Sequence, residues 1–379
     1  MILFLNINKL AVYLIIIMSK IKSLQSIRCV AILCVITSHC PLGDFGGFGV
    51  SLFIILSGFV MFYNYQTRRI NTGIIPSLKF TIGKIKKLYP LHLLTMTLPL
   101  ILALNHLEKQ FSISSLLGLI FKIFSNILLI QDWFPKTSIY FSLNAVAWYL
   151  SLCLFLYFIF PKVLNKLRQY SFIQAINTIG LLFLIQITIS FCLKYICVTS
   201  SLFDNFIHWF TYIFPIARSL DFIIGCCTCI VFSKIKDYFT QEQTFMTSII
   251  YTAFEMVAII LGIYVYLNFY IERKTILGSE SFVYKTIYTP CSVLLIFLFA
   301  MNKGLLSTIL TNKLTIWIGD ISAYLFLIHF QVISFYNIVT SKLGLKSSNL
   351  IKFVIIMTVS ILLSIAYKKL ENKFLKYRN

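Results

Sequence analysis

Ten long apolar runs with few charges fill most of this chain and leave it few ways to fold. Each is long enough to cross a bilayer as a helix, which takes about 20 residues. A soluble fold of 379 residues could not bury so much apolar surface, since 59% of the residues are hydrophobic and only 12% are charged. We therefore predict an all-α integral membrane protein. The ten predicted transmembrane helices cover about 24–41, 48–65, 88–105, 141–161, 173–194, 209–232, 246–270, 286–301, 316–338 and 351–367.

A further apolar run, 115–131, is interrupted by Lys122, Ser125 and Asn126. If this run does not cross and the N-terminus is cytoplasmic, at least twice as many basic residues fall in cytoplasmic segments as in outer ones, as the positive-inside rule requires. If it crossed, the bias would reverse in every later loop. We therefore predict a re-entrant or interfacial segment between the third and fourth transmembrane helices, with both termini cytoplasmic.

The formal charge of +21 raises the question of nucleic-acid binding. The basic residues, however, separate the apolar runs and do not form one polar face, so we expect membrane lipid and no nucleic acid as a partner. The ten cysteines lie mostly within apolar runs and lack the paired spacing of zinc sites, so they are interpreted as small buried apolar residues. No metal site is predicted.

The N-terminus does not resemble a cleavable signal peptide, because no small-residue cleavage site follows its apolar stretch. Met18 could be a second start, directly before a basic segment. We therefore interpret residues 1–17 as an N-terminal extension that is dispensable or lies upstream of the true start. Residues 18–379 are interpreted as one membrane domain.

Two ionisable residues lie in the first predicted helix. Arg28 and His39 are eleven positions apart, which places them on nearly the same helix face and about 16 Å apart along the axis. Ionisable groups at such depth are costly and point to a functional site. A neutral histidine can take a proton from a hydroxyl. From spacing alone, an interhelical hydrogen bond for His39 and a snorkelling Arg28 explain the pattern equally well.

Other polar residues are candidates for the same site. Ser57 and Gly58 lie in a glycine-rich segment that allows close approach of a helix or a ligand. Lys84 and Lys87, before Pro90, could bind the phosphates of a nucleotide-linked donor or simply fix the topology.

Two later pairs could be functional or structural. Arg218 and Asp221 are three positions apart and can form an ion pair on one helix, while Tyr324 and His329 share a late helix. Three further histidines near predicted helix ends receive no role: His92, His106 and His208.

In this order and spacing, the motifs resemble those of the acyltransferase-3 family of bacterial membrane acyltransferases over residues 20–375. The matching segments are Arg28…His39, Gly49-Val50…Phe53…Ser57-Gly58-Phe59, Trp148…Pro161, Arg218…Gly225, Gly319…His329 and Glu371. Three positions depart from the family pattern. Lys84 and Lys87 replace two arginines and offer point charges instead of planar forks. Cys153 replaces a glutamate, and Lys373 replaces a proline after Glu371.

The resemblance implies transfer of an acyl group, usually acetyl, from cytoplasmic acyl-CoA to a hydroxyl of a cell-surface polysaccharide or its lipid-linked precursor, such as an O-antigen or exopolysaccharide. It implies a location in the bacterial inner membrane. Acetyl-CoA would be a co-substrate, and no bound cofactor is expected. The alternative that the polar residues leave open is a transporter or flippase without chemistry. The oligomeric state is left open.

The resemblance also assigns roles to residues. It implies His39 as catalytic base with Arg28 as its partner. Four residues would bind the acyl donor: Lys84, Lys87, Ser57 and Gly58. Six would contact the acceptor or support the site: Trp148, Arg218, Asp221, Tyr324, His329 and Glu371.

Overall fold

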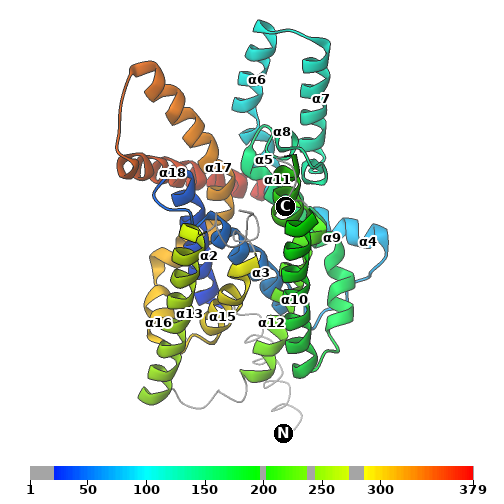
Figure 1. Cartoon of the computed structure of the whole chain (residues 1–379), viewed down its shortest axis with the longest axis vertical. Coiled ribbons are helices and arrows are strands. Elements are labelled where there is room, and N and C mark those ends of the chain that lie inside the picture. The colour runs from blue at the N-terminus through cyan, green and yellow to red at the C-terminus, as the bar shows by residue number, and fades with distance from the viewer. Residues whose placement is uncertain (1–20, 197–201, 237–243, 273–285, 379) are drawn as a thin grey trace.

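The computed structural model describes residues 21–196, 202–236, 244–272 and 286–378, and within these ranges the chain is helical without strands (Figure 1). The predicted all-α integral membrane fold is confirmed. Eight helical spans in the described residues are long and apolar enough to cross a membrane. They are Gly46–Tyr65, Tyr89–Lys109, Ala145–Leu167, Phe172–Leu193, Asn205–Ile235, Phe245–Leu267, Lys313–Leu343 and Asn349–Lys373.

Each of the ten predicted transmembrane segments coincides with helical structure. The bounds are α2 Lys22–His39, α3 Gly46–Tyr65, α5 Tyr89–Thr95 with α6 Thr97–Lys109, α9 Trp148–Leu167, α10 Phe172–Ile196, α12 Pro215–Ile235, α13 Phe245–Glu272, α15 Thr289–Met301, α17 Lys313–Leu343 and α18 Asn349–Arg378. Five shorter helices join them: α4 Ile74–Ile85, α7 Ile113–Ile127, α8 Thr137–Tyr140, α11 Leu202–His208 and α16 Leu305–Leu310. The extension predicted at residues 1–17 lies outside the described residues.

The third predicted helix is broken in the structure, between α5 and α6. Pro99 has no N–H to donate to the carbonyl of Thr95, so the regular hydrogen bonding stops there. Beyond the break, α6 has no buried residue and forms a projecting hairpin with α7 (Figure 1). The segment predicted as re-entrant or interfacial is therefore a distinct helix, α7, and its place relative to the bilayer stays a prediction.

The core is built on α2 and α3, and glycines bring their partner helices very close. A Cβ at Gly58 of α3 would collide with the carbonyl oxygen of Phe222 on α12, and one at Gly225 of α12 would collide with that of Ile55. Gly319 of α17 likewise lies against the backbone of α2. Small residues of this kind let membrane helices pack backbone to backbone. The glycines in three of the motifs thus fix the helix contacts.

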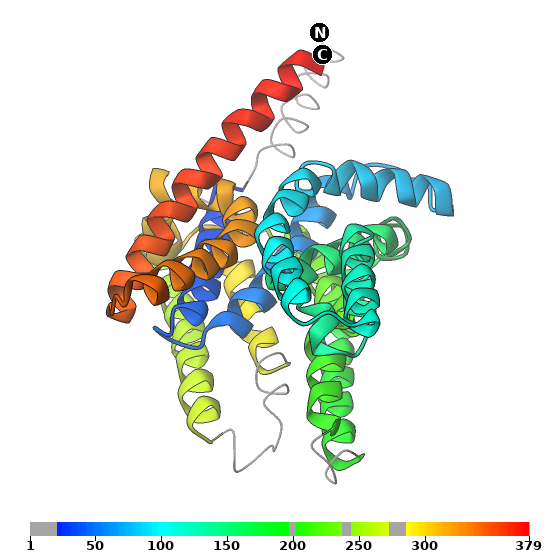
Figure 2. The same ribbon diagram turned by 90° about the horizontal axis from the view of Figure 1, so that it is seen from above.

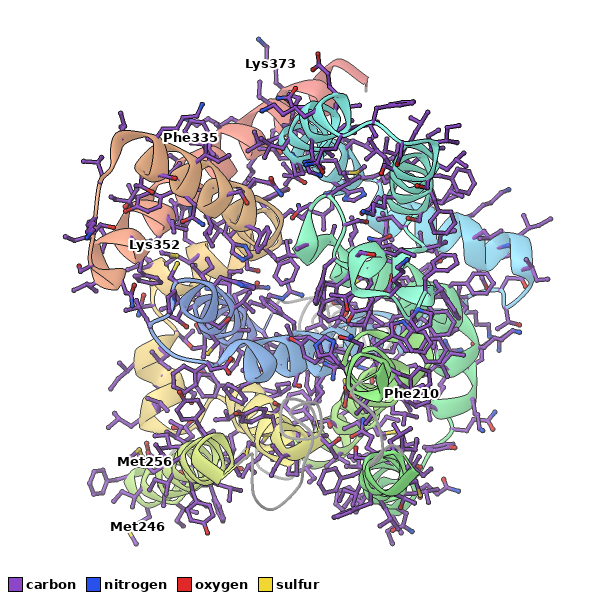
Figure 3. The ribbon with its side chains drawn as sticks, turned by 45° about the horizontal axis from the view of Figure 1, so that its top comes forward. Phe210, Met246, Met256, Phe335, Lys352 and Lys373 are labelled. Atoms are coloured by element: carbon purple, nitrogen blue, oxygen red, sulfur yellow. The ribbon has the colours of Figure 1, made fainter. Side chains whose placement is uncertain are left out.

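The peripheral helices present apolar side chains outward. Met246 and Met256 of α13 are largely exposed and point away from the bundle (Figure 3). The C-terminal part of α18 extends beyond the rest of the bundle (Figure 2), and it carries the basic residues Lys368, Lys369 and Lys373. Lipid is the solvent that suits such an apolar outer surface, and the basic end suits the interface.

Candidate active site

A cavity of about 230 Å³ lies between α2, α3, α4, α9 and α17, and we call it the Arg28 cavity. Arg28 and Lys84 supply its cationic groups. The remaining polar side chains in its wall are neutral: Ser57, Tyr149, Cys153, Tyr157 and Ser322. A site with cations and no lining carboxylate, among the described residues, favours an anionic ligand.

The two cations of this cavity are held by neighbouring side chains. The Lys84 ammonium donates a hydrogen bond of 2.5 Å to the hydroxyl of Tyr65 and lies 4.4 Å from the centre of that ring. Arg28 Nη1 donates to Gln25 Oε1 over 3.4 Å. Lys87, also predicted to bind the donor, is exposed just beyond the end of α4 and does not line the cavity.

Cys153 stands in this cavity at the position where the family pattern has a glutamate. The hydroxyls of Tyr149 and Tyr157 flank its thiol, and Tyr157 also approaches Ser57. The glutamate position of the family pattern is therefore occupied by a thiol between two tyrosine hydroxyls, one of which also contacts a serine. Of the four predicted donor residues, Ser57 and Lys84 line the cavity, whereas Gly58 lies at the contact between α3 and α12.

A second cavity, of about 360 Å³, surrounds the C-terminal end of α2, and we call it the His39 cavity. The His39 side chain is exposed to this space. Aromatic rings form much of its wall: Phe141, Trp148, Tyr212, Phe326 and Phe330. Asp44 and His208 add polar groups. Flat aromatic faces beside a few hydrogen-bonding groups suit a polar ring such as a sugar.

Asp44 and His208 received no role from the sequence, yet both line the His39 cavity. His208 Nδ1 pairs with the hydroxyl of Tyr140 at 3.1 Å, which fixes the ring. No motif marked either residue, because packing alone brings the start of α3 and the end of α11 to the same space. The sequence offers one weak signal for them, since each is a polar residue at or next to the end of an apolar helix.

The two cavities share one residue. Phe326 of α17 lines both, and its ring lies 5.0 Å from that of Tyr149 and 6.0 Å from that of Phe53, measured between centroids. Both neighbours belong to the Arg28 cavity. Phe326 is thus a partition between the cationic cavity and the histidine.

His329, one turn further along α17, lies against His39. Their ring centroids are 5.4 Å apart. His329 is buried, its Nδ1 pairs with the carbonyl of Leu325 at 3.0 Å, and its Nε2 has no hydrogen-bond partner among the described residues. Two imidazoles therefore share one site, one facing the cavity and one behind it.

Arg218 and Asp221 form the predicted pair on α12, with 3.1 Å between Nη1 and Oδ2 and both side chains fully buried. Gln186 donates to the other oxygen of Asp221 at 2.6 Å. The guanidinium lies 5.5 Å from the ring centre of Tyr212, a wall residue of the His39 cavity. The pair therefore lies behind this wall and supports it.

The remaining predicted residues divide between the two regions. Trp148 lines the His39 cavity. Tyr324 donates a hydrogen bond of 2.5 Å to Glu371 and thereby ties α17 to α18, and neither residue lines the Arg28 cavity or the His39 cavity.

The fold and these cavities define a multi-pass membrane protein with a polar site between its helices. Residues 21–369, nearly the whole chain, match the acyltransferase domain of the acyltransferase-3 family. The chain therefore belongs to this family and is a membrane acyltransferase. Comparison with curated proteins gives no match, and neither does comparison with solved structures.

Proposed function

We propose that this protein transfers an acetyl group from acetyl-CoA to a hydroxyl of a cell-surface glycan or its precursor. The observation that carries the proposal is the pair of cavities that meet at Phe326. One holds cations suited to a nucleotide-linked donor, and the other holds a histidine among aromatic rings suited to a sugar. An acyltransferase needs both substrates close together with a base between them.

The donor enters the Arg28 cavity in this proposal. Arg28 and Lys84 attract the phosphates of coenzyme A, and exposed Lys87, three residues after Lys84, adds positive charge that would steer them. The excess of basic residues in the predicted cytoplasmic segments supports a position of this end of α2 at the cytoplasmic face of the bacterial inner membrane, where acyl-CoA is found. The thioester then has to pass Phe326 to reach His39.

The chemistry follows from the neutral imidazole. The acceptor hydroxyl attacks the thioester carbonyl carbon, so that a C–O bond forms and the C–S bond breaks. His39 takes the hydroxyl proton and returns it to the departing thiolate, which leaves as coenzyme A with a free thiol. His329 holds His39 in place from behind. The products are an acetyl ester and coenzyme A, and no further reactant is needed.

A transporter or flippase is the alternative from a different class. Buried Arg218 and Asp221 could mark a polar pathway. Their contacts with each other, with Gln186 and with Tyr212 favour a supporting role, since they are already engaged in the protein.

The test uses the purified full-length chain in lipid vesicles, with acetyl-CoA and glycan from the producing cells. Transfer predicts that free coenzyme A appears in step with a glycan mass gain of one acetyl group. Coenzyme A release that requires no acceptor, or glycan movement across the vesicle without mass gain, would contradict the proposal.

A further inference from the structure

We propose that the acceptor is lipid-linked, and that its hydrocarbon chain lies in an apolar crevice beside the His39 cavity. This inference rests on the proposed function and names the form in which the glycan is presented. The crevice has a volume of about 280 Å³ and lies between α2, α3, α13, α15 and α16. Its lining consists of aliphatic and aromatic side chains, with glycine and alanine on α13.

The crevice meets the His39 cavity at one short segment, the residues directly before α3. Asp44 lines the cavity, and the next residue, Phe45, lines the crevice. Phe45 stacks on Tyr266 of α13 with ring centroids 4.2 Å apart, and the Tyr266 hydroxyl accepts the N–H of Asp44 at 3.4 Å. A molecule with a sugar in the cavity would therefore have its attached chain at the mouth of the crevice.

The crevice is also long enough for a hydrocarbon chain. One end lies near Phe45, level with the His39 end of α2, and the other reaches Ile27 on the same helix. Twelve residues of α-helix separate Ile27 from His39, which corresponds to about 18 Å along the axis. This is more than half of the roughly 30 Å hydrocarbon thickness of a bilayer. An extended chain could lie parallel to α2.

The chemistry of the crevice selects the occupant. A free polysaccharide has no apolar part to place in a hydrophobic groove, whereas a polyprenyl or acyl chain loses little on leaving bulk lipid and gains a fixed position. Fixing the chain would position the sugar hydroxyl at His39 and reduce the entropic cost of orientation. Asp44 and Phe45 are neighbours in the chain, and one lines the cavity while the other lines the crevice. Binding of the hydrocarbon chain is thereby connected directly to the reacting centre.

Gly262 of α13 offers a clean variant, because it lines the crevice and a Cβ built there meets nothing within 4 Å. Gly262→Leu would place an aliphatic side chain in the crevice, and its Cβ would meet no neighbouring atom. Gly180→Leu on α10 is the matched control, since a Cβ at Gly180 is equally free and Gly180 does not line the crevice.

The assay compares two acceptor pools with acetyl-CoA. One is lipid-linked oligosaccharide extracted from the producing cells, and the other is the same oligosaccharide released from lipid by mild acid. We expect wild-type protein to prefer the lipid-linked pool. Gly262→Leu should lower transfer to that pool about tenfold, the loss expected when about two methylene groups no longer fit. Transfer to the released pool should stay unchanged, and Gly180→Leu should match wild type with both.

Equal wild-type rates on the two pools would overturn the lipid-linked acceptor while leaving acyl transfer intact. So would an equal loss on both pools in Gly262→Leu, or no loss on either, since the crevice would then be structural or filled by bulk lipid alone. Wild-type protein that acetylates neither pool would instead refute the proposed function itself.

Discussion

The rings of His39 and His329 lie 5.4 Å apart although they come from the first and the last parts of the described chain. They meet because α2 packs along α17, with Gly319 directly against the backbone of α2. His329 is fixed by the carbonyl of Leu325, so its second nitrogen points away from its own helix. This arrangement makes His329 a positioning residue for His39.

Replacing His329 tests this role. His329→Leu should lower kcat about tenfold, about 1.4 kcal/mol of lost positioning, because His39 loses the imidazole that packs against its ring. The KM for acetyl-CoA should stay unchanged, since His329 does not line the Arg28 cavity. His329→Gln, whose amide reaches about as far as Nε2, should recover part of the rate. A rise in KM with normal kcat in both variants would argue for a role in donor binding instead.

Phe326 separates the two cavities, so shortening it should open the partition. We expect Phe326→Ala to hydrolyse acetyl-CoA faster without acceptor, because water from the His39 cavity would reach the thioester. Transfer to glycan should fall at the same time. Phe326→Leu keeps most of the volume and should behave like wild type. The measurement is coenzyme A release with and without glycan. If Phe326→Ala hydrolyses acetyl-CoA without acceptor no faster than wild type does, Phe326 is not a partition.

The donor site can be located by comparing the effects of replacing Lys84 and Lys87 on the KM for acetyl-CoA. Lys84 lines the Arg28 cavity, while Lys87 is exposed outside it. Lys84→Met should raise the KM for acetyl-CoA about tenfold, as expected for one lost charge-assisted contact. Lys87→Met should raise it less, and its effect should vanish at high salt because exposed charges are screened. Equal effects at all salt concentrations would place the donor phosphates outside the cavity.

Glu255 is a fully buried carboxylate on α13, and its partners explain why it is tolerated. Its two oxygens accept the N–H groups of Leu306 and Ser307 at 3.0 and 3.2 Å, at the start of α16. The absence of a side chain at Gly304 makes room for the carboxylate. Glu255 therefore caps a helix inside the bundle.

Removing this cap should destabilise the protein without touching the site. Glu255→Ala leaves two N–H groups without their acceptor and should cost about 3–5 kcal/mol. Glu255→Gln keeps one acceptor oxygen and should cost less. In thermal unfolding in detergent, wild type should have the highest melting temperature, Glu255→Gln the next and Glu255→Ala the lowest. A Gln variant less stable than the Ala variant would exclude capping as the reason for this carboxylate.

Much of the fold could be predicted from the sequence because lipid imposes a simple rule on helix length and polarity. The break at Met96 could have been anticipated from Pro99. The position of α5 beside the break depends on its packing against α17, which no local sequence pattern describes. The glycines of the motifs were recognised, yet whether Gly58 meets a ligand or Phe222 depends on how α3 and α12 cross. The capping role of Glu255 could not be predicted, because its partners at the start of α16 are about 50 residues away in the sequence.

The candidate site was predictable only in part. Arg28 and His39 were expected on one helix face, and they line the two successive cavities along α2. The contact of His39 with His329, and the places of Asp44 and His208, arise from tertiary packing between distant segments. Phe326 is an ordinary apolar residue in the sequence, and its position between two cavities gives it its importance.

The central claim is that His39 removes the proton from the acceptor hydroxyl, and the most direct measurement is acetyl transfer by His39→Ala in lipid vesicles. The rate should fall about 100- to 10,000-fold, the usual contribution of a general base. The variant should insert into the membrane as wild type does and elute at the same volume in size-exclusion chromatography. His106→Ala is the control, since His106 is exposed on α6 and lines neither of these two cavities. Wild-type transfer by His39→Ala would contradict the account.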